Sequence, residues 1–235
     1  MFRRTIRKGR KKRALAFEPL ERRDLLAVSL NLGGPQVPAP LLTPGAAVEN
    51  VNVSDDSDFR QSEMSVDVNP TNPLNLAGFS HRVAGGTTQP VIDVYFSEDG
   101  GGNWSRTQID SGFDGLSATA ARFDPTIKFD SRGVLHIAYG VSNQLVTARS
   151  TDGGQTFQPP TVVAGPTNGL DKWNLAVGSD GLGGEAVYIV YHVINDNELF
   201  LTGSNDGGQS FVPPVSITDI GITDDSDVVF FADPT

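Results

Sequence analysis

Three aspartates recur along the chain at almost constant spacing, each between a serine and a pair of glycines: Asp99, Asp152 and Asp206. The serine-led segments that hold them start 53 and 54 residues apart. Carboxylates can act as acid and base in glycosidic chemistry, or as calcium ligands. A glycosidic pair must lie within roughly 5–10 Å, and equivalent carboxylates on separate repeats stand too far apart to cooperate. The spacing therefore favours a structural role in a repeated turn.

Each aspartate stands in a segment that is typical of a tight hairpin turn. The segments read SEDGGGNW from Ser97, STDGGQTF from Ser150 and SNDGGQSF from Ser204. An Asp carboxylate accepts backbone N–H groups of the turn that follows it, and glycine adopts positive φ without a Cβ clash. The closing Trp or Phe can bury its ring under the turn. We assign this structural role to Ser97, Asp99, Gly101, Trp104, Ser150, Asp152, Gly154, Thr156, Phe157, Ser204, Asp206, Gly208, Ser210 and Phe211.

The three segments resemble the Asp-box, or BNR repeat, of sialidase-like β-propellers, which is written S-x-D-x-G-x-[ST]-[WF]. The second and third segments match every specified position, whereas the first has Asn103 in the Ser/Thr slot. The resemblance implies that each turn joins the third and fourth strands of a blade at the outer rim. It also implies that ligands meet the start of each innermost strand and the loops near the propeller axis.

Candidate ligand-facing residues are those expected at the starts of the innermost strands and in the neighbouring loops. A rim of mixed charge with one tryptophan suits a polar glycan or a peptide. The alternative is that Asp124 and Asp171–Lys172 only form the turns that open a blade. The candidates are Arg60, Arg82, Arg122, Asp124, Asp171, Lys172 and Trp173, with Asp58 and His81 at neighbouring positions.

Catalytic residues stay unknown at this stage. The resemblance implies that a sialidase combines an arginine triad, a Tyr nucleophile with a Glu partner, an Asp acid and an N-terminal [FY]-R-I-P motif. Phe59-Arg60-Gln61-Ser62 stands near the expected place of that motif but lacks Ile and Pro. The four tyrosines lie in apparent strands, where packing explains them. If the chain belongs to an exo-α-sialidase, the remaining catalytic residues are expected beyond Thr235.

Charge divides the chain sharply and limits its partners. Through Asp24 ten basic residues face three acidic ones, and from Leu25 onward eight basic residues face 25 acidic ones, a net charge of −17. An acidic body repels phosphate backbones, so we expect no nucleic-acid partner. The chain has no cysteine, which excludes disulfides and thiolate chemistry. No stretch approaches the ~18 consecutive apolar residues of a membrane span.

The basic N-terminal segment, residues 1–27, contains FEPLERRDLLA from Phe17. This segment resembles the planctomycete-type extracellular sorting segment, written LEPR-XLL, although Arg22 stands where the short form has Pro. We therefore predict export to the cell surface or the extracellular space, with a basic tail as the alternative. Residues 28–51 are rich in Pro and Gly and are expected to form a linker.

From residue 52 onward, short runs of β-branched and aromatic residues alternate with turn residues, and no sustained helical period is found. Four short antiparallel strands in about 50 residues describe a propeller blade. We therefore predict an all-β chain with blades at 58–110, 111–165 and 166–219 and the start of another at 220–235. The expected strands are Met64–Val68, Val91–Phe96, Thr126–Phe129, Val134–Tyr139, Leu145–Ala148, Ala186–His192, Leu199–Thr202 and Val228–Phe231.

An acidic repeat supports this phasing, because SDDSD from Ser54 recurs as TDDSD from Thr223, about three units later. We read both as solvated turns and expect no metal or other cofactor, with weak calcium binding as the alternative. Propellers close a ring of about 4–8 blades. Three blades and a start are too few, so we expect this chain to be part of a six- or seven-bladed propeller. By itself it should form an open arc that is prone to self-association.

Three functions remain open from the sequence. The favoured hypothesis is an exported, sialidase-like Asp-box propeller that binds glycans or other polar ligands as part of a longer protein, with cell-surface matrix as a candidate partner. The alternatives are an exo-glycosidase of sialidase type and a structural adhesion repeat. The presence of a full arginine triad would favour the enzyme.

Overall fold

The structure is a computed structural model, and it describes residues 51–55, 58–165, 167 and 169–218. The sorting segment, nearly all of the linker, the second acidic cluster and the predicted strand Val228–Phe231 lie outside these residues. Within the described ranges, no helix has the length and apolarity needed to cross a bilayer.

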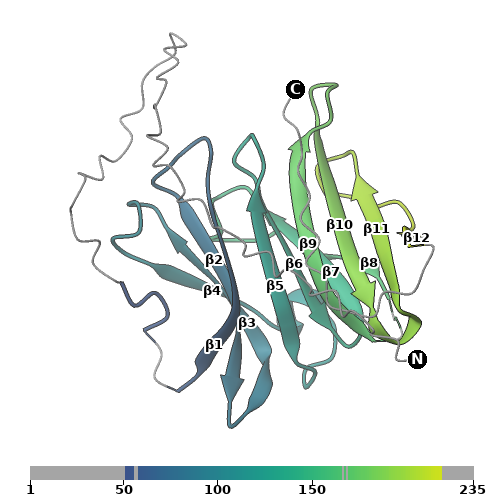
Figure 1. Ribbon diagram of the computed structural model, residues 1–235. Helices are drawn as coiled ribbons and strands as arrows, with labels where there is room; N and C mark the ends of the chain where they lie inside the picture. The colour runs from purple at the N-terminus through teal and green to yellow at the C-terminus, as the bar shows by residue number, and fades with distance from the viewer. Residues whose placement is uncertain (1–50, 56–57, 166, 168, 219–235) are drawn as a thin grey trace, which may run out of the picture. The chain divides into compact units, whose positions relative to one another are not determined.

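Three four-stranded antiparallel sheets follow one another along the chain (Figure 1). The first holds β1 (Arg60–Val68), β2 (Leu76–Ala84), β3 (Thr87–Ser97) and β4 (Ser105–Ile109). The second holds β5 (Arg122–Phe129), β6 (Leu135–Val141), β7 (Gln144–Ser150) and β8 (Thr161–Ala164). The third holds β9 (Leu170–Ser179), β10 (Glu185–Val193), β11 (Glu198–Ser204) and β12 (Val215–Ser216).

The strands of each sheet pair in chain order, so each sheet is a simple meander. The only helical segments among the described residues are two short ones, α1 (Ser111–Asp114) and the 3₁₀ turn η1 (Ile194–Asp196). The prediction of an all-β chain made of four-stranded antiparallel blades is confirmed. We call the three sheets blades 1, 2 and 3 in chain order.

Strand β3 is longer than its apolar run predicted, because it begins at Thr87 and includes Pro90. Proline has no N–H to give to a ladder and is usually found at strand irregularities. Here the pairing of β2 with β3 shifts register between His81 and Val83, which pair with Ile92 and Thr88. Pro90 lies between these two pairs, where the ladder of hydrogen bonds is already interrupted. The missing N–H of the proline therefore leaves no ladder acceptor without its donor.

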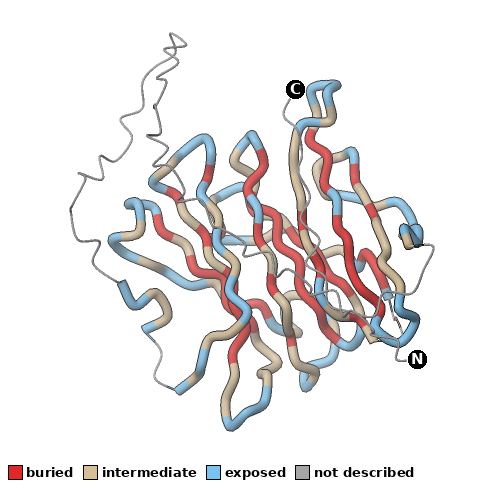
Figure 2. The backbone as a smooth tube through the Cα atoms, in the orientation of Figure 1, coloured by how far each residue is buried: buried red, intermediate tan, exposed pale blue. Residues whose placement is uncertain are grey.

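The hydrophobic core lies at the seams between blades rather than inside any one of them. One cluster joins Phe79, Ile92 and Val94 of blade 1 to residues of blade 2 such as Ile127 and Ile137. The second cluster joins blade 2 to blade 3 through residues that include Leu145 and Trp173. Buried segments run along the middle strands of the sheets, and exposed segments mark the turns (Figure 2).

The three turns that contain Asp99, Asp152 and Asp206 are closed by a short series of hydrogen bonds. In the second turn, the N–H of Gly154 donates to Ser150 Oγ at 2.9 Å, and Ser150 Oγ donates to Asp152 Oδ1 at 2.7 Å. The backbone N–H and the hydroxyl of Thr156 donate to the two oxygens of Asp152 at 2.9 and 2.5 Å. Gly153 and Gly154 have φ of 75° and 103°, which only glycine adopts without strain.

The first turn replaces the usual hydroxyl with an amide and keeps the same contacts. Asn103 donates its backbone N–H to Asp99 Oδ1 at 2.8 Å and its side-chain Nδ2 to Asp99 Oδ2 at 2.7 Å. The third turn repeats the hydroxyl version, with Ser210 donating to Asp206. The slot therefore requires a side-chain donor rather than a hydroxyl as such.

The second and third turns also contact the preceding blade through a glycine carbonyl. Asn75 of blade 1 donates to the carbonyl oxygen of Gly153 at 3.2 Å, and Arg149 of blade 2 donates to that of Gly207 at 3.2 Å. The closing rings Phe157 and Phe211 pack against the two core clusters. Each of these turns thus closes its own hairpin and fastens its blade to the one before it.

Replacing Asp152 by Ala is expected to lower the free energy of unfolding by about 1–3 kcal/mol, because the three groups that donate to this carboxylate lose their acceptor. The pKa of Asp152 is lowered, since the donors from Thr156 and Ser150 outweigh the effect of burial. This contribution is therefore present above the ordinary Asp pKa and lost as the pH falls through the folded value. Urea unfolding between pH 2 and 7 would measure both effects, with the exposed neighbour Thr151→Ala as control. Equal stability of the two variants would contradict the assigned role.

Candidate functional site

The first strand of each blade carries one non-glycine residue with strained backbone. Glu63, Asp124 and Lys172 have φ of 51°, 48° and 44°. Each lies at an irregularity in the pairing of β1, β5 or β9 with the second strand of its blade. Such conformations cost on the order of 1–3 kcal/mol and persist only where the surroundings enforce them, often at functional sites.

The three strained residues converge, and we call them the bulge cluster. Lys172 Nζ lies 3.6 Å from Glu63 Oε1 and 3.6 Å from Asp124 Oδ1. The backbone N–H of Asp124 donates to Glu63 Oε2 at 3.1 Å, and that of Lys172 donates to Asp124 Oδ2 at 3.1 Å. Each acidic side chain thus accepts a hydrogen bond from the backbone N–H of the equivalent residue in the next blade. These hydrogen bonds stabilise the positive φ of Asp124 and Lys172.

The surroundings of the cluster oppose the ionisation of Asp124 and favour the charged form of Lys172. Burial, followed by a hydrogen bond to Glu63 and the charge of Glu63, raises the pKa of Asp124 to about 6. The pKa of Lys172 is also raised, because its acidic neighbours outweigh the opposing effect of burial. His81 Nδ1 lies 2.9 Å from Glu63 Oε2, and burial lowers the pKa of His81. Near neutral pH Lys172 is therefore charged, and the imidazole of His81 is uncharged.

A shallow pocket of about 260 Å³ opens above this cluster. Besides the bulge cluster, its lining includes polar side chains such as Thr126 and Asn174 and one tryptophan, Trp173. The indole of Trp173 is buried, and its N–H has no acceptor among the described residues. Its ring packs beside Phe123 in the space left by Gly140, where a Cβ would stand 2.5 Å from the indole.

Two of the predicted ligand-facing arginines are held inside the protein instead. Arg122 is fully buried, and its guanidinium donates to both oxygens of Asp114 at 2.9 and 2.6 Å. Arg82 is buried and donates to both oxygens of Asp93, which is itself fully buried. A charged group below the surface needs such a partner, because leaving it unpaired would be costly. The expectation that Arg82 and Arg122 face a ligand is therefore wrong.

The other predicted residues lie at or near the strand starts. Arg60 is exposed at the start of β1 and lines a separate pocket of about 380 Å³ with Asp58 and Phe59. Asp171 precedes Lys172 on β9, and its charge contributes to the raised pKa of Lys172. The structure thus brings Asp124, Lys172 and Trp173 to one pocket, and Arg60 to another.

Glu63 was missed as a site residue, although the sequence contains a signal for it. Glu63, Asp124 and Lys172 stand at equivalent positions of the first strands of their blades, directly before Met64, Pro125 and Trp173. An alignment of the three blades on these positions would have placed three charged residues in one column. The bulges themselves have no local sequence signature, because residues of both signs occupy them.

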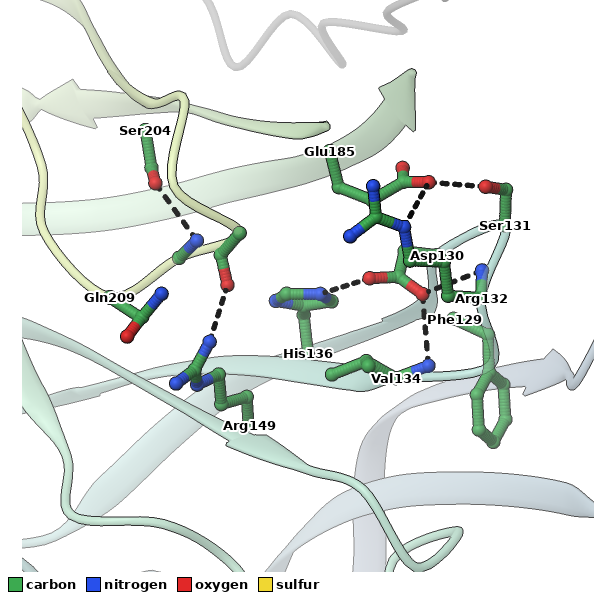
Figure 3. A network of polar contacts seen from close by, with 12 residues as sticks. Phe129, Asp130, Ser131, Arg132, Val134, His136, Arg149, Glu185, Ser204 and Gln209 are labelled. Atoms are coloured by element: carbon green, nitrogen blue, oxygen red, sulfur yellow. Dashed lines mark hydrogen bonds and ion pairs between the residues drawn. The ribbon is translucent and has the colours of Figure 1, made fainter. Parts of the chain in front are cut away.

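A second polar cluster lies at the seam between blades 2 and 3 (Figure 3). Asp130 accepts the backbone N–H groups of Arg132 and Val134 at 3.0 and 2.9 Å. Its other oxygen lies 3.2 Å from Nε2 of His136, and both side chains are buried. These contacts close the turn between β5 and β6. They also hold the carboxylate of Asp130 inside the seam.

The same cluster reaches into blade 3 through Glu185, at the start of β10. Ser131 donates to Glu185 Oε1, and Arg132 Nε lies 3.8 Å from that oxygen. Glu185 is buried, so its partners come from the protein rather than from solvent. Because Glu185 of blade 3 is engaged with Ser131 and Arg132 of blade 2, we infer that this cluster stabilises the seam between the two blades.

Metal binding has no support in the described part of the chain, where no three His, Asp or Glu side chains gather to hold an ion. The first acidic cluster is described only at Ser54, Asp55 and Asp58, and the second lies outside the described residues. The calcium alternative therefore stays untested.

No family model matches the chain, and no curated protein matches it in sequence. Solved structures do resemble it. The GH93 α-L-arabinofuranosidase of Fusarium graminearum, in complex with arabinobiose, is 14% identical, with a TM-score of 0.50 over 71% of this chain and 52% of that chain. The α-L-arabinanase of Penicillium chrysogenum is 16% identical, with a TM-score of 0.48 over 71% and 52%. An exo-β-1,3-galactanase of Phanerochaete chrysosporium is 10% identical, with a TM-score of 0.49 over 72% and 38%.

At these identities the likeness shows the fold alone. The blades of this chain are those of a β-propeller of the kind found in glycoside hydrolases. The chain spans about half the length of the first two of these proteins.

Replacing Asp124 by Asn is expected to raise the free energy of unfolding at pH 7 by about 1–2 kcal/mol, because it removes a carboxylate whose ionisation is opposed by burial and by Glu63. Asparagine also tolerates positive φ. With its pKa raised from 3.8 to about 6, Asp124 favours folding most below pH 4 and loses this contribution as the pH rises to 6. The stability difference between wild type and variant should therefore grow over that interval.

Chemical unfolding of both proteins from pH 3 to pH 8 would measure this difference. Asp196→Asn, in the 3₁₀ turn η1, provides a matched control. A constant difference across the whole interval would contradict the shifted pKa of Asp124.

Proposed function

We propose that the bulge cluster binds an uncharged glycan. The observation that carries this proposal is the convergence of three charged side chains, from equivalent strained positions on three successive blades, at one open pocket. Two carboxylates and an ammonium offer acceptors and donors for sugar hydroxyls within one small area. Strain concentrated at these three positions supports a functional rather than a structural origin.

The acidic residues of the bulge cluster favour an uncharged ligand over a sialic acid, which carries a carboxylate. The cluster contains two acidic side chains and one lysine, and Asp171 lies next to it in the sequence. A ligand carboxylate would be repelled there. Arg82 and Arg122, two of the predicted ligand-facing arginines, are engaged by internal carboxylates. The arabinofuranosidase that resembles this chain is described with arabinobiose, which is an uncharged disaccharide.

The arrangement of the carboxyl groups favours binding over hydrolysis. The two carboxyl groups of a glycosidase stand about 5–5.5 Å apart in retaining enzymes and about 6.5–9.5 Å apart in inverting ones. In this chain Glu63 Oε1 and Asp124 Oδ1 both lie 3.6 Å from Lys172 Nζ. Both carboxyl groups are therefore engaged with one ammonium group, which favours a binding role for them.

Hydrolysis is a second candidate function, and the raised pKa of Asp124 is the observation that favours it. A carboxyl group with a pKa near 6 can hold a proton for a leaving group at mildly acidic pH. The reaction would require a second carboxylate at a greater distance than Glu63. An exo-α-sialidase activity would further require arginines other than Arg82 and Arg122.

Binding is tested by calorimetry with arabino- and galacto-oligosaccharides and with sialyllactose. We expect the uncharged ligands to bind and sialyllactose to bind at least tenfold more weakly. Asp124→Asn and Glu63→Gln should each weaken binding about tenfold or more, because a hydrogen bond to a charged group contributes about 1.5–3 kcal/mol. Lys128→Ala, an exposed residue of the same strand outside the pocket, provides the control.

Preferential binding of sialyllactose, or binding that neither variant weakens, would overturn the assignment. Release of reducing sugar by the wild type, lost in Asp124→Asn, would establish hydrolysis in its place.

We also propose that the protein is exported, on the basis of the sorting segment in residues 1–27. A reporter fused behind residues 1–51 should reach the cell surface or the medium. Replacing Leu25 and Leu26 by Asp should retain it inside the cell, whereas replacing Val28 and Leu30 by Ser should not. Equal export of all three fusions would contradict this proposal.

A further inference from the structure

A small polar pocket opens at the seam between blades 2 and 3, at the opposite end of strand β5 from Asp124, and we call it the seam pocket. Its volume is about 290 Å³. Pockets for small molecules measure roughly 300–1,000 Å³, so a ligand of this one has to be small. Among the described residues that line it, only Val134 has an apolar side chain larger than glycine. Polar groups therefore determine what the pocket can hold.

One carboxylate oxygen at the seam pocket is buried without a hydrogen-bond partner. Glu185 lines the pocket and is 4% exposed. Its Oε1 accepts from Ser131 and lies 3.8 Å from Arg132 Nε. Its Oε2 has no donor among the described residues and is turned away from both of these partners (Figure 3). Because an unpaired buried carboxylate oxygen costs free energy, we expect a donor group from outside the chain to meet it.

The guanidinium group of Arg149 supplies a donor to the same pocket. Its Nε donates to Gln158 Oε1 at 2.6 Å, and its Nη1 donates to the carbonyl oxygen of Gly207 at 3.2 Å. The remaining nitrogen, Nη2, donates to none of the described residues. Since the Nε–H is already used, the side of the group that pairs Nε with Nη2 cannot grip a carboxylate with two parallel bonds. Nη2 therefore suits a single acceptor, such as a hydroxyl oxygen.

The equivalent place at the seam between blades 1 and 2 is filled. Asn75 in blade 1 and Val134 in blade 2 each stand directly before the second strand of their blade. Asn75 donates to the carbonyl oxygen of Gly153, and a Cβ on Gly153 would stand 2.7 Å from the Asn75 amide. A Cβ on the equivalent Gly207 would have Arg149 Nη1, at 3.9 Å, as its nearest neighbour. Blade packing therefore does not require the opening, which arises from the residues at this particular seam.

The charges of the seam pocket disfavour ions of either sign. Three carboxylates, of Asp130, Glu185 and Asp206, and two guanidinium groups, of Arg132 and Arg149, line it. Asp130 and Asp206 already accept backbone N–H groups of their own turns. A cation at Glu185 would be repelled by Arg132, and an anion at Arg149 would meet the carboxylates. Uncharged hydroxyl groups, which both donate and accept, match this lining.

We propose that the seam pocket binds one uncharged sugar unit. One hydroxyl group donates to Glu185 Oε2, and a second accepts from Arg149 Nη2. The pocket shares no residue with the pocket of the bulge cluster, and none of the contacts that support it involves that cluster. It is therefore a site of its own, whether or not the bulge cluster binds a glycan. Where both sites are occupied, one chain holds two sugar segments at opposite ends of the same strands.

Titration of the isotope-labelled 235-residue chain with D-galactose and with L-arabinose, followed by amide NMR, tests this proposal. We expect the backbone amide signals of Gly184, Gly207 and Gln209 to shift with the concentration of at least one sugar. The same shifts should remain in Asp124→Asn, which alters the bulge cluster and leaves the seam pocket unchanged.

Glu185→Gln is expected to raise the dissociation constant at the seam pocket about tenfold or more. Ser131 and Arg132 hold the side-chain oxygen on their side, so the amide nitrogen takes the place of Oε2 and presents a donor to the ligand hydroxyl. Glu198→Gln, which removes the same charge from blade 3 outside the pocket, is the matched control and should leave the shifts unchanged.

A second variant keeps the test independent of any effect of Glu185→Gln on folding. Val134→Asn places in blade 2 the residue that fills the equivalent position of blade 1. It should preserve the fold, as judged by the amide spectrum, and abolish the shifts at Gly184 and Gln209.

Three outcomes would overturn the proposal. The first is that neither sugar shifts these amides in the folded wild type, including the case in which Ca²⁺ shifts them instead. The second is sugar binding that Glu185→Gln and Val134→Asn leave unchanged. The third is a set of shifts confined to Asn174 and its neighbours, which would support the glycan site at the bulge cluster and remove this one. Shifts confined to the seam pocket would overturn the proposed function and support the present site.

Discussion

A four-stranded sheet cannot bury both of its faces by itself, and in this chain each blade is buried by the next. Both core clusters combine residues of two successive blades, and neither lies within a single sheet. The polar contacts follow the same rule, since Ser65 and Asp67 of blade 1 accept backbone N–H groups of blade 2. The turns that contain Asp152 and Asp206 add hydrogen bonds to the preceding blade. Stability in such an array is set by the interfaces between neighbours rather than by any single unit.

The bulge cluster depends on the same seams. Glu63 accepts the N–H of Asp124, and Asp124 accepts the N–H of Lys172, so every strained residue after the first is held by its predecessor. Each blade supplies one residue, and none of the three blades contains the site by itself. Opening one seam would therefore relax the backbone of the following bulge and separate the charges. Binding chemistry and blade packing are coupled through the same backbone groups.

The fold was predictable because its signals are local and repeated. Turn residues, alternating apolar runs and the recurring Ser-x-Asp-Gly-Gly segments each act within a few residues, and the period of these segments indicated the length of one blade. The site was only partly predictable. Asp124 and Lys172 were found from their place at strand starts, whereas Glu63 was not. The register shifts that give all three residues a positive φ have no local sequence signature, so the sequence did not show that they converge.

Arg82 and Arg122 show more clearly what a sequence pattern cannot predict. Arg82 pairs with Asp93 on the adjacent strand, and Arg122 pairs with Asp114 of the short helix α1. Neither pairing has a sequence pattern, because each depends on how a bulge or a loop turns a side chain inward. A charged residue near a strand start therefore gives no indication of whether it meets a ligand or a buried counter-ion. Only tertiary structure separates these two cases.

Asn103 has a consequence for how this kind of turn is recognised in other chains. Its amide places an N–H donor where Thr156 and Ser210 place an O–H, and Asp99 accepts it at 2.7 Å. A search pattern that admits only Ser or Thr at this slot describes the commonest chemistry rather than the physical requirement. Writing the slot as any short side chain with a donor would recover degenerate blades. Repeat counts, and hence estimates of ring size in distant relatives, would change accordingly.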